Sequence, residues 1–321
     1  MTASDTTVFQ SPPELPKPYY QRDFGAAYLG DSLNLMRSLD EQSVNLILTS
    51  PPFALTREKE YGNKSSDEYI EWFLPFAREF HRLLTPDGSF VIDLGGAYLP
   101  GFPVRSIYQF ELLVRLCREL GFFLAQEFYH YNPARLPSPA EWVNVRRIRV
   151  KDAVNTVWWL SKSEFPKADN RKVLKEYSDS MKDLLDNGYK PKLRPSGHDI
   201  SNKFQKDNNG AIPPNLLRLA NTESNSAYIR RCKQVGINPH PARFPREFAE
   251  FFIAFLTDEN DLVLDPFAGS NTTGFVAENW KRRWLAFEIE DEYLQGSLYR
   301  FEEVNDLFST LSPNHEQTDQ E

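Results

Sequence analysis

Four consecutive residues have the chemistry to handle an amino group that is attached to an aromatic ring. They are Ser50, Pro51, Pro52 and Phe53, and they close an apolar run at residues 43–49 that is typical of a buried strand. The serine offers a hydroxyl and a main-chain carbonyl, while two prolines, which lack N–H groups, present carbonyls from a stiff loop. The phenylalanine supplies a ring for stacking on a base taken out of a double helix. Hydrogen-bond acceptors around such an amine favour a tetrahedral nitrogen and can take up its proton.

A second motif follows another apolar run, at residues 262–264, and suits a nucleoside cofactor. It places a glycine-containing loop directly before a helix, where the backbone can approach a ligand and free N–H groups can bind an anion. Gly269 and Gly274 have the spacing of a phosphate loop, but Phe275 replaces its lysine, which disfavours a nucleoside triphosphate. S-adenosylmethionine fits, because its carboxylate suits the helix end and its ribose suits an acid on the next strand. The predicted cofactor contacts are Asp265, Pro266, Phe267, Gly269, Ser270, Asn271, Thr272 and Glu288.

Each motif has an ordinary structural explanation when it is taken alone. Ser-Pro-Pro is frequent in surface turns, and a strand–turn–helix unit often carries a glycine for packing. Both motifs, however, lie at the carboxyl ends of predicted strands, where α/β sheets bind their ligands. Together they predict methylation of an exocyclic amino group on DNA, either N4 of cytosine or N6 of adenine.

Composition narrows the class of protein. The chain has 321 residues, of which 40% are hydrophobic, and this is enough for a sizeable core. Its net charge of −8 argues against a purely electrostatic nucleic-acid binder, although basic residues can still gather on one face. Cys117 and Cys232 lie in neither a disulfide nor a metal-binding pattern, so we expect no metal site. The sequence shows neither a secretory signal nor a membrane span, and we expect a cytoplasmic protein.

Strand-like and helix-like segments alternate on both sides of a polar stretch. This alternation predicts an α/β fold with a doubly wound, mostly parallel sheet. We expect strands at residues 44–49, 89–94, 122–131, 154–160, 262–264 and 284–289, and helices at 68–84, 106–120, 246–256, 272–279 and 292–308. The predicted division is a flexible arm (1–18), two parts of the α/β domain (19–162 and 237–308), a polar insert (163–236) and a polar tail (309–321).

The order of these features resembles that of the β-class amino-group DNA methyltransferases, in which the catalytic motif precedes the cofactor motif. The resemblance extends through residues 30–33, 93–98, 155–159, 194–200, 212–217 and 240–245. Serine in the first motif position is similar to the cytosine-N4 branch, whereas adenine enzymes usually carry Asp or Asn there. The resemblance implies the S-adenosylmethionine-dependent methyltransferase fold in a circularly permuted order, with the insert as a target-recognition region.

The same resemblance implies a substrate and a biological setting. The substrate would be duplex DNA with a flipped cytosine, the inner one of the sequence CAGCTG. The enzyme would belong to a type II restriction-modification system and protect host DNA from a cognate restriction enzyme, without a stable complex between the two. We expect a monomer.

Further site residues are predicted around the two motifs. Asp93 closes a strand and is expected to accept a hydrogen bond from Ser50, so that the amine proton can pass towards a carboxylate. The resemblance implies that Asp31 contacts the adenine edge of the cofactor, although it could equally cap a helix. It also implies that residues 240–245, and among them His240, Pro241 and Phe244, wall the methionine end of the cofactor.

Basic residues are the candidates for contact with DNA. Lys192, Arg194 and His198 lie inside the insert and are predicted to reach phosphates or base edges. A second basic cluster, at residues 146–151, is either solvated surface or a further phosphate contact.

Other functions fit the chain less well. Cytosine-C5 methylation needs a nucleophilic cysteine, and the sequence contains no Pro-Cys dipeptide. The long insert and the motif order disfavour a methyltransferase that acts on RNA or protein amines. A catalytically silent DNA-binding regulator would not need both motifs intact, so adenine-N6 methylation is the nearest alternative.

Overall fold

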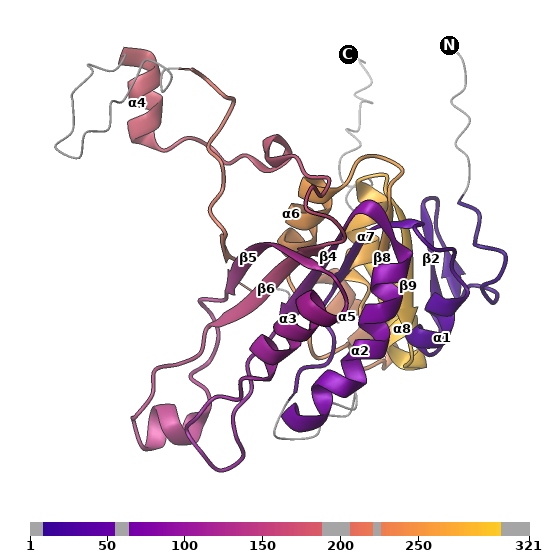
Figure 1. Ribbon diagram of the computed structural model, residues 1–321, viewed down its shortest axis with the longest axis horizontal. Helices are drawn as coiled ribbons and strands as arrows, with labels where there is room; N and C mark the ends of the chain where they lie inside the picture. Colours follow the sequence, from indigo (N-terminus) through magenta and orange to yellow (C-terminus); the bar gives the residue numbers. More distant parts are fainter. Residues whose placement is uncertain (1–8, 55–63, 188–205, 221–225, 303–321) are drawn as a thin grey trace, which may run out of the picture.

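The molecule is built around one mostly parallel β-sheet. The computed structural model describes residues 9–54, 64–187, 206–220 and 226–302 (Figure 1). Within these residues nine strands pair in the order β1-β2-β9-β8-β3-β4-β6-β5-β7. Their bounds are β1 (Tyr20–Gln21), β2 (Gly25–Leu29), β3 (Val44–Thr49), β4 (Leu84–Leu94), β5 (Phe123–Tyr131), β6 (Val154–Ser161), β7 (Leu216–Arg218), β8 (Leu262–Asp265) and β9 (Arg283–Glu288).

The strand directions bring many carboxyl ends to one edge of the sheet. Strands β2, β9, β8, β3 and β4 run parallel to one another, and β6 is antiparallel to both β4 and β5. Strand β5 therefore points in the same direction as β4, and β7 runs parallel to β5. This arrangement confirms the predicted α/β fold with a mostly parallel sheet, and it collects ligand-binding loops at a single edge.

The central strands are mostly apolar because helices cover both faces of the sheet. Along β3, Ile47 packs into the core on one face, while Leu46 and Leu48 pack into the core on the other. One face carries α1 (Ser32–Arg37), α2 (Ser66–Leu83) and α3 (Tyr108–Glu119); the other carries α6 (Arg246–Leu256), α7 (Thr272–Asn279) and α8 (Asp291–Ser297).

Several boundaries differ from the predictions, each for a local reason. Helices α6 and α7 begin and end where they were expected. Strand β4, by contrast, begins at Leu84 instead of residue 89, because a register shift opposite Val44 accommodates the extra residues. The predicted final helix is shorter, since α8 passes into a 3₁₀ turn, η5 (Leu298–Arg300), and residues 303–321 lie outside the described part of the chain.

The polar stretch at residues 163–236 contains more order than its sequence pattern indicated. It includes the 3₁₀ turn η2 (Asn170–Val173), α4 (Asp179–Asn187), β7 and α5 (Ala227–Val235). Strand β7 extends the sheet beside β5, whereas α4 projects away from the sheet at the upper left of Figure 1. Part of the predicted insert is thus built onto the α/β body, and its role as a target-recognition region stays a prediction.

The described residues do not meet the requirements of a membrane-spanning helix or of a metal-binding cluster. None of these helices combines the length and the apolar character that crossing a bilayer would require. Within the same residues, no three metal-binding side chains come together as a group.

Candidate active site

The two sequence motifs leave neighbouring strands at the same edge of the sheet. Strands β3 and β8 are parallel partners, with Leu46 opposite Val263. Just before the motifs diverge, Thr49 Oγ1 donates a hydrogen bond of 2.8 Å to Asp265 Oδ1. Loops that are more than two hundred residues apart in the sequence therefore start side by side, as the predicted chemistry requires.

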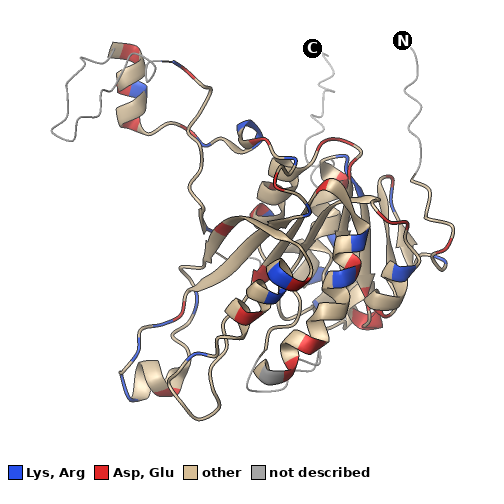
Figure 2. Cartoon of the chain, viewed as in Figure 1, with Lys and Arg blue, Asp and Glu red and all other residues tan. Residues whose placement is uncertain are grey.

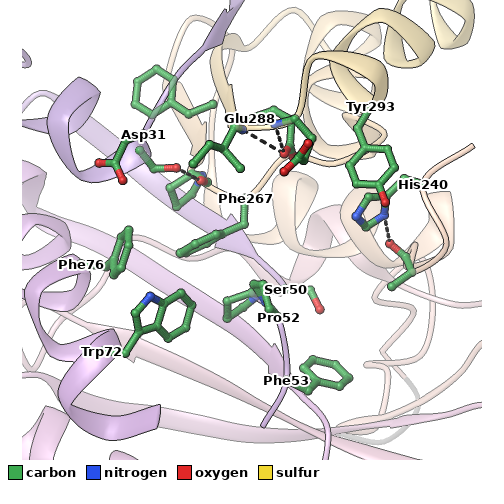
Figure 3. Close-up of a pocket in the computed structure, with 17 residues that line it drawn as sticks. Asp31, Ser50, Pro52, Phe53, Trp72, Phe76, His240, Phe267, Glu288 and Tyr293 are labelled. Carbon is green, nitrogen blue, oxygen red and sulfur yellow. Dashed lines mark hydrogen bonds between the residues drawn. The ribbon is translucent and has the colours of Figure 1, made fainter. Parts of the chain in front are cut away.

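A first cavity, cavity A, lies between these loops, α2 and the end of β9 (Figure 3). Its volume is about 250 Å³. Aromatic rings form much of its wall, with Phe267 5.1 Å from Phe76 and 5.9 Å from Trp72 between ring centroids. Flat apolar walls with acidic residues at the margin suit a purine nucleoside. Predicted residues that line cavity A are Asp31, Ser50, Pro51, Pro52, Phe53, His240, Pro266, Phe267 and Glu288.

Glu288 ends β9 with its carboxylate largely held by main-chain N–H groups. Its Oε2 accepts from Gly269 N at 2.7 Å, and its Oε1 accepts from Ile289 N and Glu290 N at 2.9 and 3.0 Å. Burial raises the pKa of this carboxyl. A carboxylate offers about four acceptor positions, so three N–H groups leave room for one ligand hydroxyl.

Asp31 shows that both of its predicted roles are compatible. Its carboxylate caps α1 by accepting from Asn34 N at 3.0 Å, and its side chain also lines cavity A.

Two predicted cofactor contacts, Asp265 and Asn271, line neither cavity of the site. The buried Asp265 accepts from Thr49 and Thr273, and burial raises its pKa to about 6. Asn271 caps α7 by accepting from Gly274 N at 2.9 Å. Both side chains point into the protein because these hydrogen bonds hold them there. They therefore shape the loop between β8 and α7 and do not face the cavity.

A second cavity, cavity B, of about 380 Å³ adjoins the first. Both cavities are lined by Ser50, Phe53, His240, Ala242 and Phe267, so they meet at the first sequence motif. The predicted residues Asp93, Pro241, Phe244, Gly269, Ser270 and Thr272 line cavity B.

The expected hydrogen bond between Ser50 and Asp93 exists, but its acceptor atom differs from the prediction. Ser50 Oγ donates to the main-chain carbonyl of Asp93 at 3.2 Å, and not to the carboxylate. Strand carbonyls lie in the plane of the sheet and point at neighbouring strands, whereas side chains stand out of it. The Asp93 carboxylate accordingly lies on one face of the sheet, where its Oδ2 is 3.4 Å from Nδ1 of His130.

His130 is a site residue that the sequence pattern did not single out. It lies near the end of β5 and packs against Phe248, with ring centroids 5.4 Å apart. His130 Nε2 and Asp93 Oδ1 are buried and have no hydrogen-bond partner among the described residues. Since both residues line cavity B, these two polar atoms are available to a polar ligand there.

Other missed residues complete the polar end of cavity B. Arg135 Nη1 donates to Asn155 Oδ1 at 2.9 Å, and Asn132 lies beside them in the cavity wall. All three adjoin the ends of β5 and β6. Polar residues at strand ends were a visible signal, but only the strand order shows that these ends lie beside Ser50.

His240 lies where the two cavities meet and is held as a neutral ring. Its ring contacts Tyr293 edge to face, with centroids 4.5 Å apart, and its Nδ1 lies 2.5 Å from the Ala242 carbonyl. Burial lowers the pKa of His240 to about 4. Gly269, at φ +50°, lets the backbone approach the His240 ring closely, because a Cβ on this residue would lie 3.1 Å from the imidazole.

The predicted DNA contacts Lys192, Arg194 and His198 lie outside the described residues. Of the basic cluster at residues 146–151, Arg146 and Arg147 are exposed.

Comparison with known proteins gives consistent matches over most of the chain. A family model described as DNA methylase matches residues 44–299. The type II methyltransferase M.PvuII of Proteus hauseri is 55% identical over 305 residues, which cover 92% of this chain and 91% of that protein. M.BglII of Bacillus subtilis is 26% identical over 291 residues, covering 88% and 70% respectively.

Solved structures give the same picture. A PvuII DNA methyltransferase described as cytosine-N4-specific matches with a TM-score of 0.73 and 49% identity, over 91% of this chain and 94% of that one. A Thermus thermophilus protein, solved in complex with S-adenosyl-L-methionine, matches with a TM-score of 0.54 and 21% identity, over 86% and 93%. The second match shows a shared fold.

Proposed function

The chain belongs to the DNA methylase family of N6- and N4-type methyltransferases, and from that membership we propose that it methylates the N4 amino group of cytosine in duplex DNA. S-adenosylmethionine is the methyl donor, and it supplies an electrophilic methyl group on a positively charged sulfur. The observation that carries the proposal is the junction of cavities A and B at Ser50 and Phe53. A nucleoside in one cavity and a base in the other would place donor and acceptor beside the same motif.

The residues of cavity A fit the proposed cofactor. Glu288 keeps an acceptor position for a ribose hydroxyl, and Asp31 lies at the margin for the adenine edge. The rings of Trp72, Phe76 and Phe267 provide a wall for the flat base. At the other end, a neutral His240 avoids placing a second positive charge beside the sulfonium.

Cavity B would hold the extruded cytosine. The Ser50 carbonyl and the stiff Pro51–Pro52 turn hold the amine, and Phe53 stacks on the ring. The amine must lose a proton as its new N–C bond forms. Asp93 lines this cavity, and its Oδ1, which has no hydrogen-bond partner among the described residues, can accept the proton while His130 lies 3.4 Å from its Oδ2.

The proposed target is CAGCTG, methylated on its inner cytosine. Support comes from the 55% identity to M.PvuII over nearly the full length of both proteins. Duplex DNA is then the partner, and methylation would protect host DNA from a cognate restriction enzyme. Contacts from residues 163–236, with Lys192, Arg194 and His198 among them, would read the sequence.

Transfer of tritiated methyl groups to plasmid DNA, followed by nucleoside analysis, tests the reaction. We expect N4-methylcytosine from the wild type and less of it from Ser50→Ala, which keeps the main-chain carbonyl but loses the hydroxyl that bonds to Asp93. N6-methyladenine as the product would replace the proposed base with the alternative, and absence of any labelled nucleoside would refute DNA methylation. Protection of the modified plasmid from cleavage at CAGCTG then tests the target, with a plasmid that lacks this sequence as the control.

A further inference from the structure

The connection between β5 and β6 forms a prong whose purpose the proposed chemistry leaves unexplained. It comprises residues 132–153, contains the short π-helix η1 (Glu141–Val145) and projects from the sheet at the lower left of Figure 1. Its two legs are tied together, because Lys151 Nζ donates to the carbonyls of Pro133 at 3.3 Å and of Arg135 at 3.1 Å. The prong is therefore braced at its base.

A neighbouring loop holds the prong from the side. Asp152 accepts a hydrogen bond from Arg105 Nη1 at 3.1 Å and another from the Tyr98 hydroxyl. Arg149 lies 4.9 Å from the centroid of the Tyr98 ring and donates to the carbonyl of Pro103 at 2.6 Å. These contacts give the prong a defined direction relative to the sheet.

The prong is basic although the whole chain is acidic. Figure 2 shows Lys and Arg positions along it, and Arg146 and Arg147 are exposed. Arg147 adopts φ +56°, a conformation that side-chain-bearing residues seldom take. The ion pair of Arg146 with Glu141 is exposed, so a phosphate can replace it at little cost. Basic residues outnumber acidic ones within residues 132–153. The basic residues are Arg135, Arg146, Arg147, Arg149 and Lys151, and the acidic ones are Glu141 and Asp152.

Apolar side chains stand in solvent beside these cations. Val150 is 85% exposed and Leu136 is 79% exposed, and they lie on the two legs that Lys151 joins. Val145 and Ile148 are also exposed, farther along the prong. Several exposed apolar side chains on one projection mark a surface that meets a partner.

The position of the prong indicates which partner it fits. Its first residues include Asn132 and Arg135, which line cavity B, so its base adjoins the cavity proposed for the target base. A DNA duplex offers phosphates to the cations and base steps to the apolar side chains. An extruded base also leaves an unstacked gap at this point of the duplex.

We propose that the prong grips the duplex at the target and stabilises the gap that the extruded cytosine leaves. Arg146 and Arg147 contact phosphates, while Leu136 and Val150 press against the unstacked partner base. This inference rests on the proposed methylation of duplex DNA, and it adds the element that favours extrusion.

The double variant Leu136→Ala with Val150→Ala tests the apolar contact. Single-turnover methyl transfer is measured on a matched duplex and on one whose target cytosine is mispaired, which lowers the free energy of extrusion. Relative to the wild type on the same duplex, we expect the variant to be about tenfold slower on the matched DNA and nearly equal on the mispaired DNA. An equal loss on both, or no loss on either, overturns the proposal. A wild type that methylates neither duplex would instead refute the proposed function.

The double variant Arg146→Gln with Arg147→Gln tests the phosphate contacts. Each lost contact should reduce the slope of log affinity against log salt concentration by about 0.9, so we expect a total change of about 2. Arg78→Gln with Arg118→Gln removes the same charge from exposed positions on α2 and α3, and should leave the slope unchanged. Equal slopes in the two double variants would overturn the phosphate contacts, and circular dichroism checks that each variant is folded.

Discussion

At the scale of single residues, the neutral His240 ring that suits a neighbouring sulfonium also makes the stability of the folded protein depend on pH. Its folded-state pKa of about 4 lies below the ordinary value of 6.5. Between these two pH values the unfolded chain binds a proton that the folded chain excludes, so this residue's contribution to stability falls as the pH drops from 6.5 to 4.

We therefore predict that the His240→Gln variant loses less unfolding free energy than the wild type as the pH falls. The difference in unfolding free energy between wild type and variant should shift in favour of the variant as the pH falls from about 7 to about 5. Urea unfolding at several pH values measures this difference. A difference that is independent of pH would contradict a neutral, buried imidazole.

Asp265 should make stability depend on pH with the opposite sign to His240. Its pKa is raised to about 6 from an ordinary 3.8, so the folded chain binds the proton more tightly and stability falls as the pH rises from 3.8 to 6. Asp265→Asn removes this titration and keeps hydrogen-bonding groups for Thr49 and Thr273. Relative to wild type, the variant should gain stability as the pH rises through this window. Urea unfolding at about pH 4.5 and about pH 7 provides the test, and an opposite trend would exclude the raised pKa.

Asp93 and His130 should control proton removal without affecting the cofactor. Both line cavity B only, so Asp93→Asn should slow single-turnover methyl transfer about a hundredfold and leave S-adenosylmethionine affinity nearly intact. His130→Phe keeps an aromatic ring beside Phe248 and should also slow methyl transfer, because it removes the polar contact to the Asp93 carboxylate. An unchanged single-turnover rate in Asp93→Asn would remove its proposed role.

The lining of the candidate site was predictable where chemistry and chain position agree. Ser50 and Glu288 each follow an apolar run, and the structure places both in cavity A. His130 also lies near a strand end, but its relevance depends on β5 lying two strands away from β4, which no local pattern encodes. For Asp93, the sequence indicated the correct hydrogen-bonded pair, while the acceptor atom followed from the orientation of the strand.

At the scale of elements, the loop between β8 and α7 depends on one close approach. Gly269 combines a left-handed φ of +50° with a contact to the His240 ring. Gly101 has a φ of +79° and no atom near its missing Cβ, so it serves as a matched control.

We predict that Gly269→Ala weakens S-adenosylmethionine binding about tenfold, because the added Cβ displaces the His240 ring. Gly101→Ala should lose a similar stability, of about 1 kcal/mol, through backbone strain, with unchanged cofactor affinity. Calorimetric titration and thermal unfolding separate the two effects. Equal cofactor affinities in both variants would show that the contact with His240 has no effect on the loop.

Element types were predictable because hydrophobic periodicity reports burial. Helix α6 repeats apolar residues at helical spacing, and it begins and ends as predicted. The order of the strands was not accessible in the same way. β3 pairs with β8 through contacts between residues far apart in the sequence, and local periodicity carries no information on such pairs.

At the scale of the whole molecule, net charge is a poor guide to the DNA-facing surface. The chain carries −8, yet cations gather on the prong, as Figure 2 shows. We predict that DNA affinity falls steeply with added salt in spite of the acidic total. Filter binding between about 50 and 200 mM salt, the range over which phosphate contacts respond, measures the slope. A flat response would contradict binding through phosphates.

The fold class and the motif order were predictable over nearly the whole chain, because the two motifs and the alternating elements are visible in sequence. The division into separate parts was harder to define. Strand β7 and α5 come from the polar stretch, yet β7 joins the sheet and α5 packs beside Tyr299. A polar average over residues 163–236 concealed these short ordered segments.

The central position of β3 between β4 and β8 also governs how the enzyme comes into being. A growing chain leaves the ribosome with β3 and β4 long before β8 is synthesised, since Thr49 and Asp265 are 216 positions apart. Until then the half-built sheet has an open edge beside β3, the kind of edge at which nascent proteins aggregate. The same delay means that a growing chain cannot yet carry its methyl donor. Methyl transfer therefore cannot start before β8 has been synthesised and has paired with β3.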